Sequence, residues 1–286
     1  GRPESYDRPV VATGSEPFVP PIPGVDKKGV FVYRTLEDLQ AIIEYANGAK
    51  SAAVIGGGLL GLEAAKAAMD LGLETTVVEA APRLMPRQLH GPASKALQRR
   101  VEALGVRVIV GAQTQAFQGN GSVNALAFAD NTLLKVDLVI VSAGIRPRDE
   151  LARDCGLEVG PRGGIAVDDT LQTSDPCIYA IGEVALHKGQ VYGLVGPGYT
   201  MAECVARTLT GGSGRFESAD LSTRLKLLGI DVATIGDPVT ASENGSCIEL
   251  NDATTATYKN VVLSPDDSTV LGAMFVGDCA EYARVH

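Results

Sequence analysis

The stretch "VIGGGLLG" at residues 54–61 constrains the fold most, because four glycines follow an apolar run. The preceding "SAAVIG" (51–56) has the composition of a buried parallel strand, and "LLGLEAAKAAMDLG" has helical spacing up to Gly72. "ETTVVEA" (74–80) is typical of a second strand. The pattern predicts a strand, a glycine turn, a helix and another strand, as in a Rossmann-like α/β domain.

The spacing of these glycines predicts a dinucleotide site at the start of the helix. Gly56 allows a tight turn, Gly58 leaves no side chain between backbone and pyrophosphate, and Gly61 lets the helix pack closely on the strand. The helix N-terminus offers N–H groups and a positive dipole end to the anion. Glu79 closes the second strand at about the 20-residue spacing of an acid that binds the adenosine ribose.

The carboxylate of Glu79 favours NADH over NADPH, because it would repel the 2′-phosphate of NADPH. Arg83 and Arg87 follow in "APRLMPRQ" and would offset this repulsion if they turned toward the ribose. If these arginines are solvated loop residues, the repulsion of the 2′-phosphate by Glu79 is not offset. We therefore expect NADH as the preferred cofactor, with NADPH as an alternative.

Composition excludes several classes of function. The net charge is −9 with Lys and Arg scattered, which argues against nucleic acid and anionic membrane surfaces as partners. The five cysteines and three histidines form no metal-ligand pattern, so we expect reduced, mostly structural thiols and no metal. Neither a membrane span nor a signal peptide is visible, and we expect a cytoplasmic protein.

Two similar segments predict where the chain passes between domains. "RPVVATGSEP" (8–17) and "DLVIVSAGIRP" (137–147) each read as an apolar strand, a small-residue turn and a proline. We expect residues 35–145 to be inserted into a domain made of 1–34 and 146–215. Residues 216–286 predict a small, mainly β domain, and "GLVGPGYTMAECVARTL" (193–209) predicts a helix that begins near Tyr199 or Thr200.

The sequence resembles the two-dinucleotide-binding-domain flavoproteins of the pyridine nucleotide-disulfide oxidoreductase class. The matching pieces are "VVATGS", "VIGGGLLGLEAA" with Glu79, "VSAGIRP" and "GGIAVDDTLQTSDPCIYAIGE". The resemblance implies a Rossmann-like NAD domain inserted into an FAD-binding domain, plus a C-terminal α+β interface domain. It also implies cofactor contacts at Ala12, Thr13, Gly14, Gly144, Gly182, Glu183 and Tyr199, besides those at the glycine turn.

For hydride transfer, the resemblance implies that Leu60 and Glu63 lie near the nicotinamide, although Glu63 would also suit an ordinary helix surface. Glu183 would meet the FAD ribityl hydroxyls, and the helix near Tyr199 would point at the flavin. These flavoproteins hold the FAD pyrophosphate with a first glycine fingerprint, which these 286 residues do not contain. We therefore expect either a partial chain or an incomplete FAD-binding domain, and no stable FAD binding by this chain alone.

Within the class, "GGGLLGLEAA", "PRLMPRQL", "AGIRP" and "LSTRLKLLGIDVATIGD" resemble the flavoprotein portion of NAD(P)H-dependent nitrite reductase large subunits. This implies electron transfer from NADH through FAD to a downstream acceptor, either an iron–sulfur and sirohaem region or a separate redox protein. A ferredoxin- or rubredoxin-type reductase and a nucleotide-binding module without redox turnover are the alternatives. The interface domain implies a homodimer.

Overall fold

The structure is a computed structural model that describes residues 5–242 and 245–286, so the start of the predicted first domain lies outside the described residues. The helices are α1 (Leu36–Ala46), α2 (Leu59–Asp70), α3 (Gly91–Ala103), α4 (Glu150–Asp154), α5 (Val195–Leu209), α6 (Pro238–Ala241) and α7 (Tyr282–Val285), with a 3-10 turn at Gly182–Val184. The strands of the first half are β1 (Val10–Val11), β2 (Ser15–Pro17), β3 (Val30–Val32), β4 (Ser51–Ile55), β5 (Glu74–Glu79), β6 (Arg107–Val110), β7 (Thr114–Gln118), β8 (Ala125–Phe128), β9 (Leu133–Lys135) and β10 (Leu138–Val141). Those of the second half are β11 (Ile145–Pro147), β12 (Ile165–Val167), β13 (Tyr179–Ala180), β14 (Ala185–His187), β15 (Thr223–Leu227), β16 (Ile230–Gly236), β17 (Ser246–Asp252), β18 (Thr257–Leu263) and β19 (Val270–Val276).

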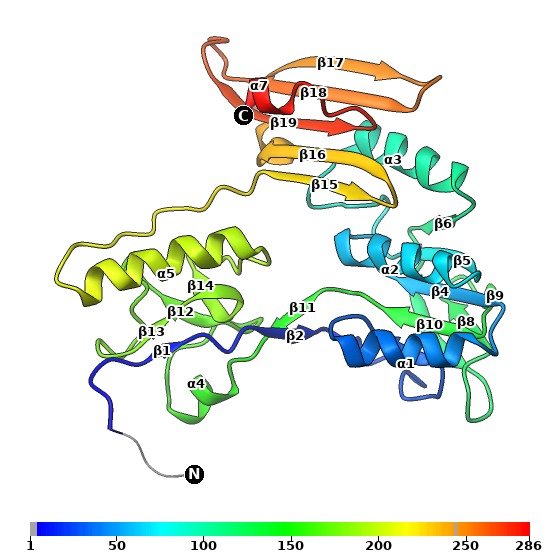
Figure 1. Ribbon diagram of the computed structural model, residues 1–286, viewed down its shortest axis with the longest axis horizontal. Helices are drawn as coiled ribbons and strands as arrows, with labels where there is room; N and C mark the ends of the chain where they lie inside the picture. The colour runs from blue at the N-terminus through cyan, green and yellow to red at the C-terminus, as the bar shows by residue number, and fades with distance from the viewer. Residues whose placement is uncertain (1–4, 243–244) are drawn as a thin grey trace. The chain divides into compact units, whose positions relative to one another are not determined.

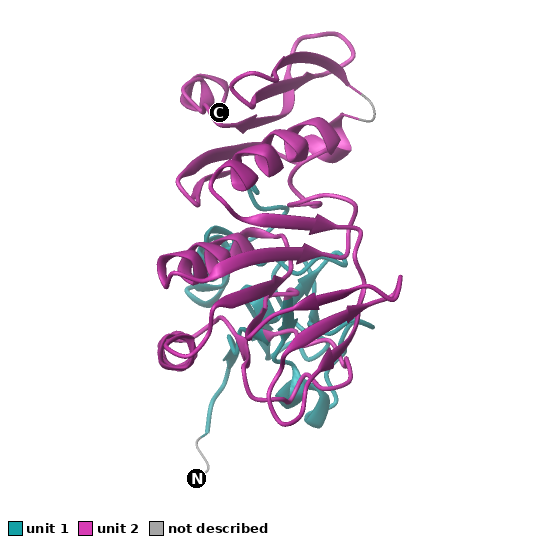
Figure 2. Cartoon of the chain, turned by 90° about the vertical axis from the view of Figure 1, so that its right-hand side faces the viewer, with its two compact units in different colours: residues 1–16, 145–221 teal, residues 17–144, 222–286 magenta. Residues whose placement is uncertain are grey.

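The chain forms two compact units, which Figure 2 colours separately. Unit 1 contains the chain up to Glu16 together with Ile145–Leu221, and unit 2 contains Pro17–Gly144 together with Ser222–His286. The chain therefore leaves unit 1 and returns to it in the two segments whose similar sequences predicted the crossings. At the ends of the inserted part, the backbone N–H of Phe18 donates to the carbonyl of Gly144 at 2.9 Å.

A five-stranded parallel sheet, in the order β3-β10-β4-β5-β6, forms the centre of unit 2. Figure 1 labels four of its strands, β10, β4, β5 and β6. Its inner strands are apolar because both faces are covered. On β4, Ala52 and Val54 face a cluster with residues of α1, α2 and α3, whereas Ala53 and Ile55 face the three-stranded β7-β8-β9 sheet. The alternation of side chains along a strand thus serves two cores at once.

The first predicted domain boundary differs from the structure. Residues 17–34 were expected in the FAD-binding domain, but they belong to unit 2. The reason is pairing at the sheet edge, since Val30 of β3 lies opposite Val139 of β10 in parallel register. Ile22 and Val25 pack against the same cluster as the three-stranded sheet. A strand of three residues carries too weak a pattern for its partner to be predicted.

The C-terminal residues form the expected mainly β domain, and Ser222–His286 belongs to the same compact unit as Pro17–Gly144. They form an antiparallel sheet in the order β15-β16-β19-β18-β17 that packs on α3. Tyr258 and Met274 are fully buried in the cluster that also contains Leu97 of α3. Arg100 strengthens this contact, since its guanidinium donates to the carbonyls of Thr255 and Ala256, each at 2.8 Å.

Unit 1 contains the parallel pairs β1-β13 and β12-β14 beside helix α5. A charged cluster ties its segments together. The carboxylate of Asp169 accepts a hydrogen bond from His187 and forms ion pairs with Lys188 and Arg215, each at 2.8 Å. These contacts hold the pKa of the Asp169 carboxyl at about 2, below its usual 3.8, with Lys188 as the largest cause and His187 next.

Helix α5 begins at Val195, earlier than the predicted start near Tyr199 or Thr200. Pro197 lies in its first turn, where a backbone N–H has no partner within the helix, so the proline does not interrupt it. Among the described residues, no helix is long and apolar enough to cross a membrane.

Candidate functional site

The glycine turn joins β4 to α2 in unit 2, and two of its glycines are required by the chain's own packing. Gly56 has a φ of +115°, and a Cβ there would lie 2.1 Å from the carbonyl oxygen of Ser142 on the neighbouring chain segment. A Cβ on Gly61 would lie 1.9 Å from the carbonyl oxygen of Gly56. These positions agree with the predicted tight turn and the predicted close approach of helix and strand.

Gly58 differs, because packing does not explain its lack of a side chain. A Cβ placed on it would have no described atom within 4 Å beyond its chain neighbours, and its φ is −84°. Gly58 is the N-cap of α2 and offers no capping side chain to the helix N–H groups. The open space thus lies directly at a helix N-terminus, which is an arrangement that suits a phosphate.

Leu60 and Glu63 follow on the first turns of α2, and the structure places both at the surface. The side chain of Leu60 is 41% exposed, and Glu63 is also exposed. Their positions leave the predicted role at the nicotinamide as a proposal. An exposed leucine beside the uncapped helix end offers an apolar surface, while Glu63 fits a surface carboxylate equally well.

Glu79 lies at the end of β5, and its carboxylate is held by two backbone donors. Oε2 accepts from the N–H of Gly57 and Oε1 accepts from the N–H of Ala81, each at 2.7 Å. A carboxylate oxygen has two lone pairs, so each oxygen retains capacity for one hydroxyl donor. The side chain predicted to bind the ribose is therefore also a structural link between the glycine turn and the loop after β5.

A second group of predicted residues gathers in unit 1. Ser15 Oγ donates to Glu183 Oε2 at 2.7 Å, and Thr13 Oγ1 donates to the carbonyl of Arg148 at 2.7 Å. Ala12 and Gly14, which flank Thr13, are in the same turn after β1, and Gly14 has a φ of +70°. The structure thus brings the "ATG" segment and the acid after "AIG" together.

The N-terminus of α5 also approaches this group. A Cβ on Gly198 would lie 3.8 Å from the Cα of Gly182, the residue before Glu183. The N-cap of α5 is Leu194, whose apolar side chain cannot accept from the helix N–H groups. Tyr199 is 69% exposed on the first turns of this helix. An uncapped helix end beside a carboxylate suits the hydroxyls and partial negative charge of a bound flavin cofactor.

Gly144 belongs to unit 2 and follows β10. It is exposed and has a φ of +116°, a conformation that favours glycine. Its predicted cofactor contact remains a proposal.

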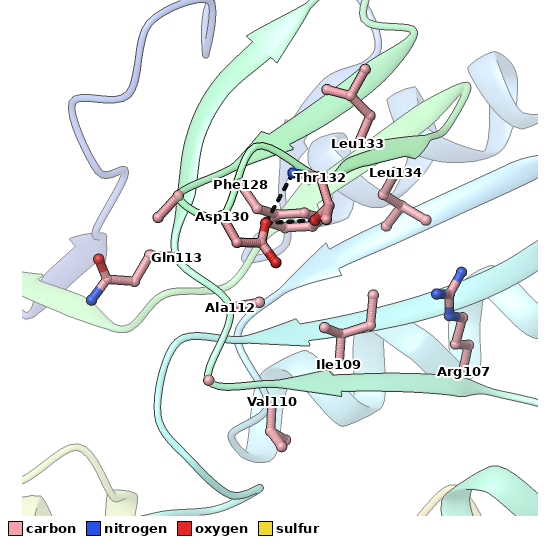
Figure 3. Close-up of a pocket in the computed structure, with 12 residues that line it drawn as sticks. Arg107, Ile109, Val110, Ala112, Gln113, Phe128, Asp130, Thr132, Leu133 and Leu134 are labelled. Carbon is pink, nitrogen blue, oxygen red and sulfur yellow. Dashed lines mark hydrogen bonds between the residues drawn. The ribbon is translucent and has the colours of Figure 1, made fainter.

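A further hollow in unit 2 lies between the edge strand β6 and the β8-β9 hairpin (Figure 3). Ile109 and Leu134 line it from opposite sides. Its carboxylate, Asp130, accepts from the N–H and Oγ1 of Thr132, and these bonds lower the pKa of the carboxyl. The hollow contains none of the predicted site residues.

Comparison with known proteins places the chain in a family. Residues 1–206 match the family described as "Pyridine nucleotide-disulphide oxidoreductase". The chain belongs to this family. Residues 222–286 match the "Rubredoxin NAD+ reductase C-terminal domain". The resemblance predicted from the glycine turn and its companion motifs is thereby confirmed.

Individual relatives agree with this assignment. The "Nitrite reductase (NADH) large subunit" of Escherichia coli is 47% identical over 100% of this chain, which covers 34% of that protein. The "Assimilatory nitrate reductase electron transfer subunit" of Bacillus subtilis is 38% identical over 98% of this chain and 36% of that protein. The NAD-dependent persulfide reductase from A. fulgidus superposes with a TM-score of 0.86 at 27% identity, covering 98% of this chain and 55% of that one. The chain spans about a third of the length of these curated relatives.

Sequence reasoning missed three participants in these sites. Ser15 bonds to Glu183, and Gly57 bonds to Glu79. The N–H of Met85 donates to the carbonyl of Gly57 at 2.9 Å and so connects the loop after β5 to the glycine turn. Ser15 and Gly57 lie within the quoted motifs, so their position was a usable signal, whereas nothing in the local sequence indicates the contact of Met85.

Proposed function

We propose that this chain is the NADH-dependent FAD oxidoreductase part of an assimilatory nitrite reductase, passing electrons from NADH through FAD to a downstream acceptor. The observation that carries the proposal is the open space at Gly58, in front of an uncapped helix N-terminus and beside the fixed carboxylate of Glu79. A glycine whose Cβ would meet nothing is explained by a ligand that must approach the backbone there.

In this proposal the chain binds and orients the nucleotide. The N-terminal N–H groups of α2 donate to the pyrophosphate, and Gly58 leaves the approach open. Glu79, already fixed by Gly57 and Ala81, accepts the ribose hydroxyls without having to reorganise. Bound NADH supplies a hydride and bound FAD accepts it. Leu60 is proposed to exclude water near the nicotinamide, with Glu63 beside it.

Unit 1 is proposed to hold FAD through Glu183, Ser15 and the N-terminus of α5. Glu183 would accept from the ribityl hydroxyls in an orientation that the hydroxyl of Ser15 fixes. The dipole of α5 would stabilise negative charge on the reduced flavin, with Tyr199 near that helix end. Ala12, Thr13, Gly14 and Gly182 would form the surrounding backbone turns.

The acceptor is inferred from the relatives. One is named for nitrite reduction with NADH and another for electron transfer in nitrate assimilation, which supports a downstream redox acceptor. An iron–sulfur and sirohaem region or a separate redox protein stays the predicted form of that acceptor. The C-terminal match favours a rubredoxin-type reductase as the second candidate function. A homodimer and a cytoplasmic location stay predictions.

The test is binding of NADH to the chain, measured by isothermal titration calorimetry. The unmodified chain is expected to bind NADH, and Gly58→Val is expected to abolish binding while its circular dichroism spectrum is unchanged. Gly48→Val is the matched control, because a Cβ at Gly48 also meets nothing and this glycine lies away from α2. NADH affinity retained in a folded Gly58→Val protein would contradict the proposal.

Redox turnover distinguishes the module from a simple nucleotide-binding protein. The 286-residue chain is expected to be colourless and to reduce no dye with NADH, because the glycine fingerprint that holds the FAD pyrophosphate is not in it. A yellow chain with stoichiometric FAD would show that the assignment of flavin contacts is wrong. A longer polypeptide that supplies the fingerprint but still turns over no NADH would favour the module without redox activity.

A further inference from the structure

Residues 80–89, which follow Glu79 and are here called the ribose loop, are fixed by side chains that they bury in the core of unit 2. Leu84, Met85 and Leu89 are fully buried in the cluster that includes α2 and α3. The hydroxyl of Ser94 on α3 donates to the carbonyl of Leu84 at 2.9 Å. The loop that adjoins the proposed ribose site is therefore a packed part of unit 2.

Arg83 closes this loop with its side chain. Its Nε donates to the carbonyl of Leu89 at 3.0 Å, and its NH2 group donates to the carbonyl of Pro86 at 3.3 Å. Burial lowers the pKa of His90, the residue after the loop, and the charge of Arg83 lowers it by a smaller amount. The guanidinium is thus directed at the carbonyls of its own loop, and it is half-buried there.

We propose that Arg83 is a positioning residue that sets the preference for NADH over NADPH. By bridging two carbonyls, it keeps the ribose loop in the conformation in which Ala81 fixes Glu79. Arg83 is also the cation nearest to Glu79 in the sequence. Because its charge is directed at the loop carbonyls, it does not neutralise the repulsion between Glu79 and a 2′-phosphate. This inference rests on the proposed binding of NADH by unit 2.

The competing role for Arg83 is that of a phosphate ligand, turning out to neutralise the 2′-phosphate of NADPH. The two roles depend on different properties of the side chain. A bridge between two carbonyls needs the planar fork of donors of an arginine, whereas attraction to a phosphate needs chiefly the positive charge. Lysine keeps the charge and lacks the fork, so an Arg83→Lys variant separates the two roles.

The experiment measures dissociation constants of NADH and NADPH for the unmodified chain, Arg83→Met, Arg83→Lys and Arg87→Met by titration calorimetry. Arg87 is the matched control, since it is an exposed arginine of the same loop. In both Arg83 variants, NADH affinity is expected to fall on the order of 10-fold. NADPH affinity should fall less, because NADPH does not depend on a fixed Glu79. Arg87→Met should leave both constants within about twofold.

Three results would overturn the inference. A selective loss of NADPH in Arg83→Met that Arg83→Lys restores would make Arg83 a phosphate ligand. Equal losses of both nucleotides would leave it a purely structural residue, and no change would remove the role altogether. Failure of the unmodified chain to bind NADH would instead overturn the proposed function, so the two failures are distinguishable.

Discussion

The roles assigned to Gly61 and Gly58 predict opposite outcomes when each glycine is replaced by alanine. In Gly61→Ala, the new Cβ would lie 1.9 Å from the carbonyl oxygen of Gly56, where ordinary contact begins at 3.4 Å, so the groups must separate by roughly 1.5 Å. Overpacking of this kind costs about 3 kcal/mol, and the better helix propensity of alanine offsets about 1 kcal/mol. The free energy of unfolding should therefore fall by about 2 kcal/mol.

Gly58→Ala should leave the free energy of unfolding nearly unchanged. Its backbone conformation is accessible to alanine, and the new Cβ meets no described atom within 4 Å. Alanine is a poorer N-cap than glycine by about 0.5 kcal/mol, and the lower entropy of the unfolded chain offsets about the same amount. The same variant should nevertheless lose NADH affinity, because the methyl group occupies the proposed pyrophosphate approach.

Urea denaturation without nucleotide, followed by far-ultraviolet circular dichroism, measures both stabilities. In a thermal scan of the same signal, the melting temperature of Gly61→Ala should drop by about 4–8 °C. The reasoning would be refuted if Gly61→Ala stayed within about 0.5 kcal/mol of the unmodified chain, or if Gly58→Ala lost as much stability as Gly61→Ala.

Three further predictions follow from other contacts. Glu79→Ala should narrow the difference between NADH and NADPH affinity, since the repulsion of the 2′-phosphate is removed; a wider difference by titration would contradict this. The folded-state pKa of Asp169, about 2, lies below the ordinary 3.8, so the ionised carboxylate stabilises unit 1 above pH 3.8 and this contribution is lost as the pH falls toward 2. Asp169→Asn should accordingly lower the melting temperature at neutral pH and match the unmodified chain near pH 2, and an equal difference at both pH values would count against it. Burial raises the pKa of the Cys279 thiol to about 11, so a thiol reagent should label this residue only on unfolding, after the exposed Cys155, Cys177 and Cys247; simultaneous labelling would contradict the burial.

Features set by neighbours along the chain could be predicted from the sequence. The capping box of α1, in which Thr35 and Asp38 exchange hydrogen bonds, follows from two residues at the right spacing. The roles of Gly56 in the turn and of Gly61 in the helix contact likewise follow from the spacing of nearby residues. The predicted start of α5 near Tyr199 or Thr200 was wrong because the helix already contains Pro197, and a proline in the first helical turn costs no hydrogen bond.

Features set by distant segments could not be predicted. The placement of residues 17–34 depends on the pairing of β3 with β10, which are more than a hundred residues apart. The attachment of the C-terminal sheet depends on apolar packing against α3, which Arg100 strengthens by donating to the carbonyls of Thr255 and Ala256. The direction in which the Arg83 side chain points depends on the backbone carbonyls of its loop. Every residue has such a carbonyl, so no sequence pattern distinguishes the two that it binds. Backbone acceptors of this kind become visible only once the chain is folded.

The hydrogen bond between Phe18 and Gly144 has a consequence for how such a chain can be rearranged. Because the two ends of the inserted segment meet, unit 1 has to accommodate only a short gap between its own two stretches, however long the insertion is. The entropy of closing a loop depends on its end-to-end separation and only weakly on its length, so this geometry adds little to the cost of folding unit 1. A segment with joined ends is also one that recombination can transplant as a cassette. Exchange of residues 17–144 for the equivalent segment of a relative is therefore a natural route to a changed inserted segment on the same unit 1.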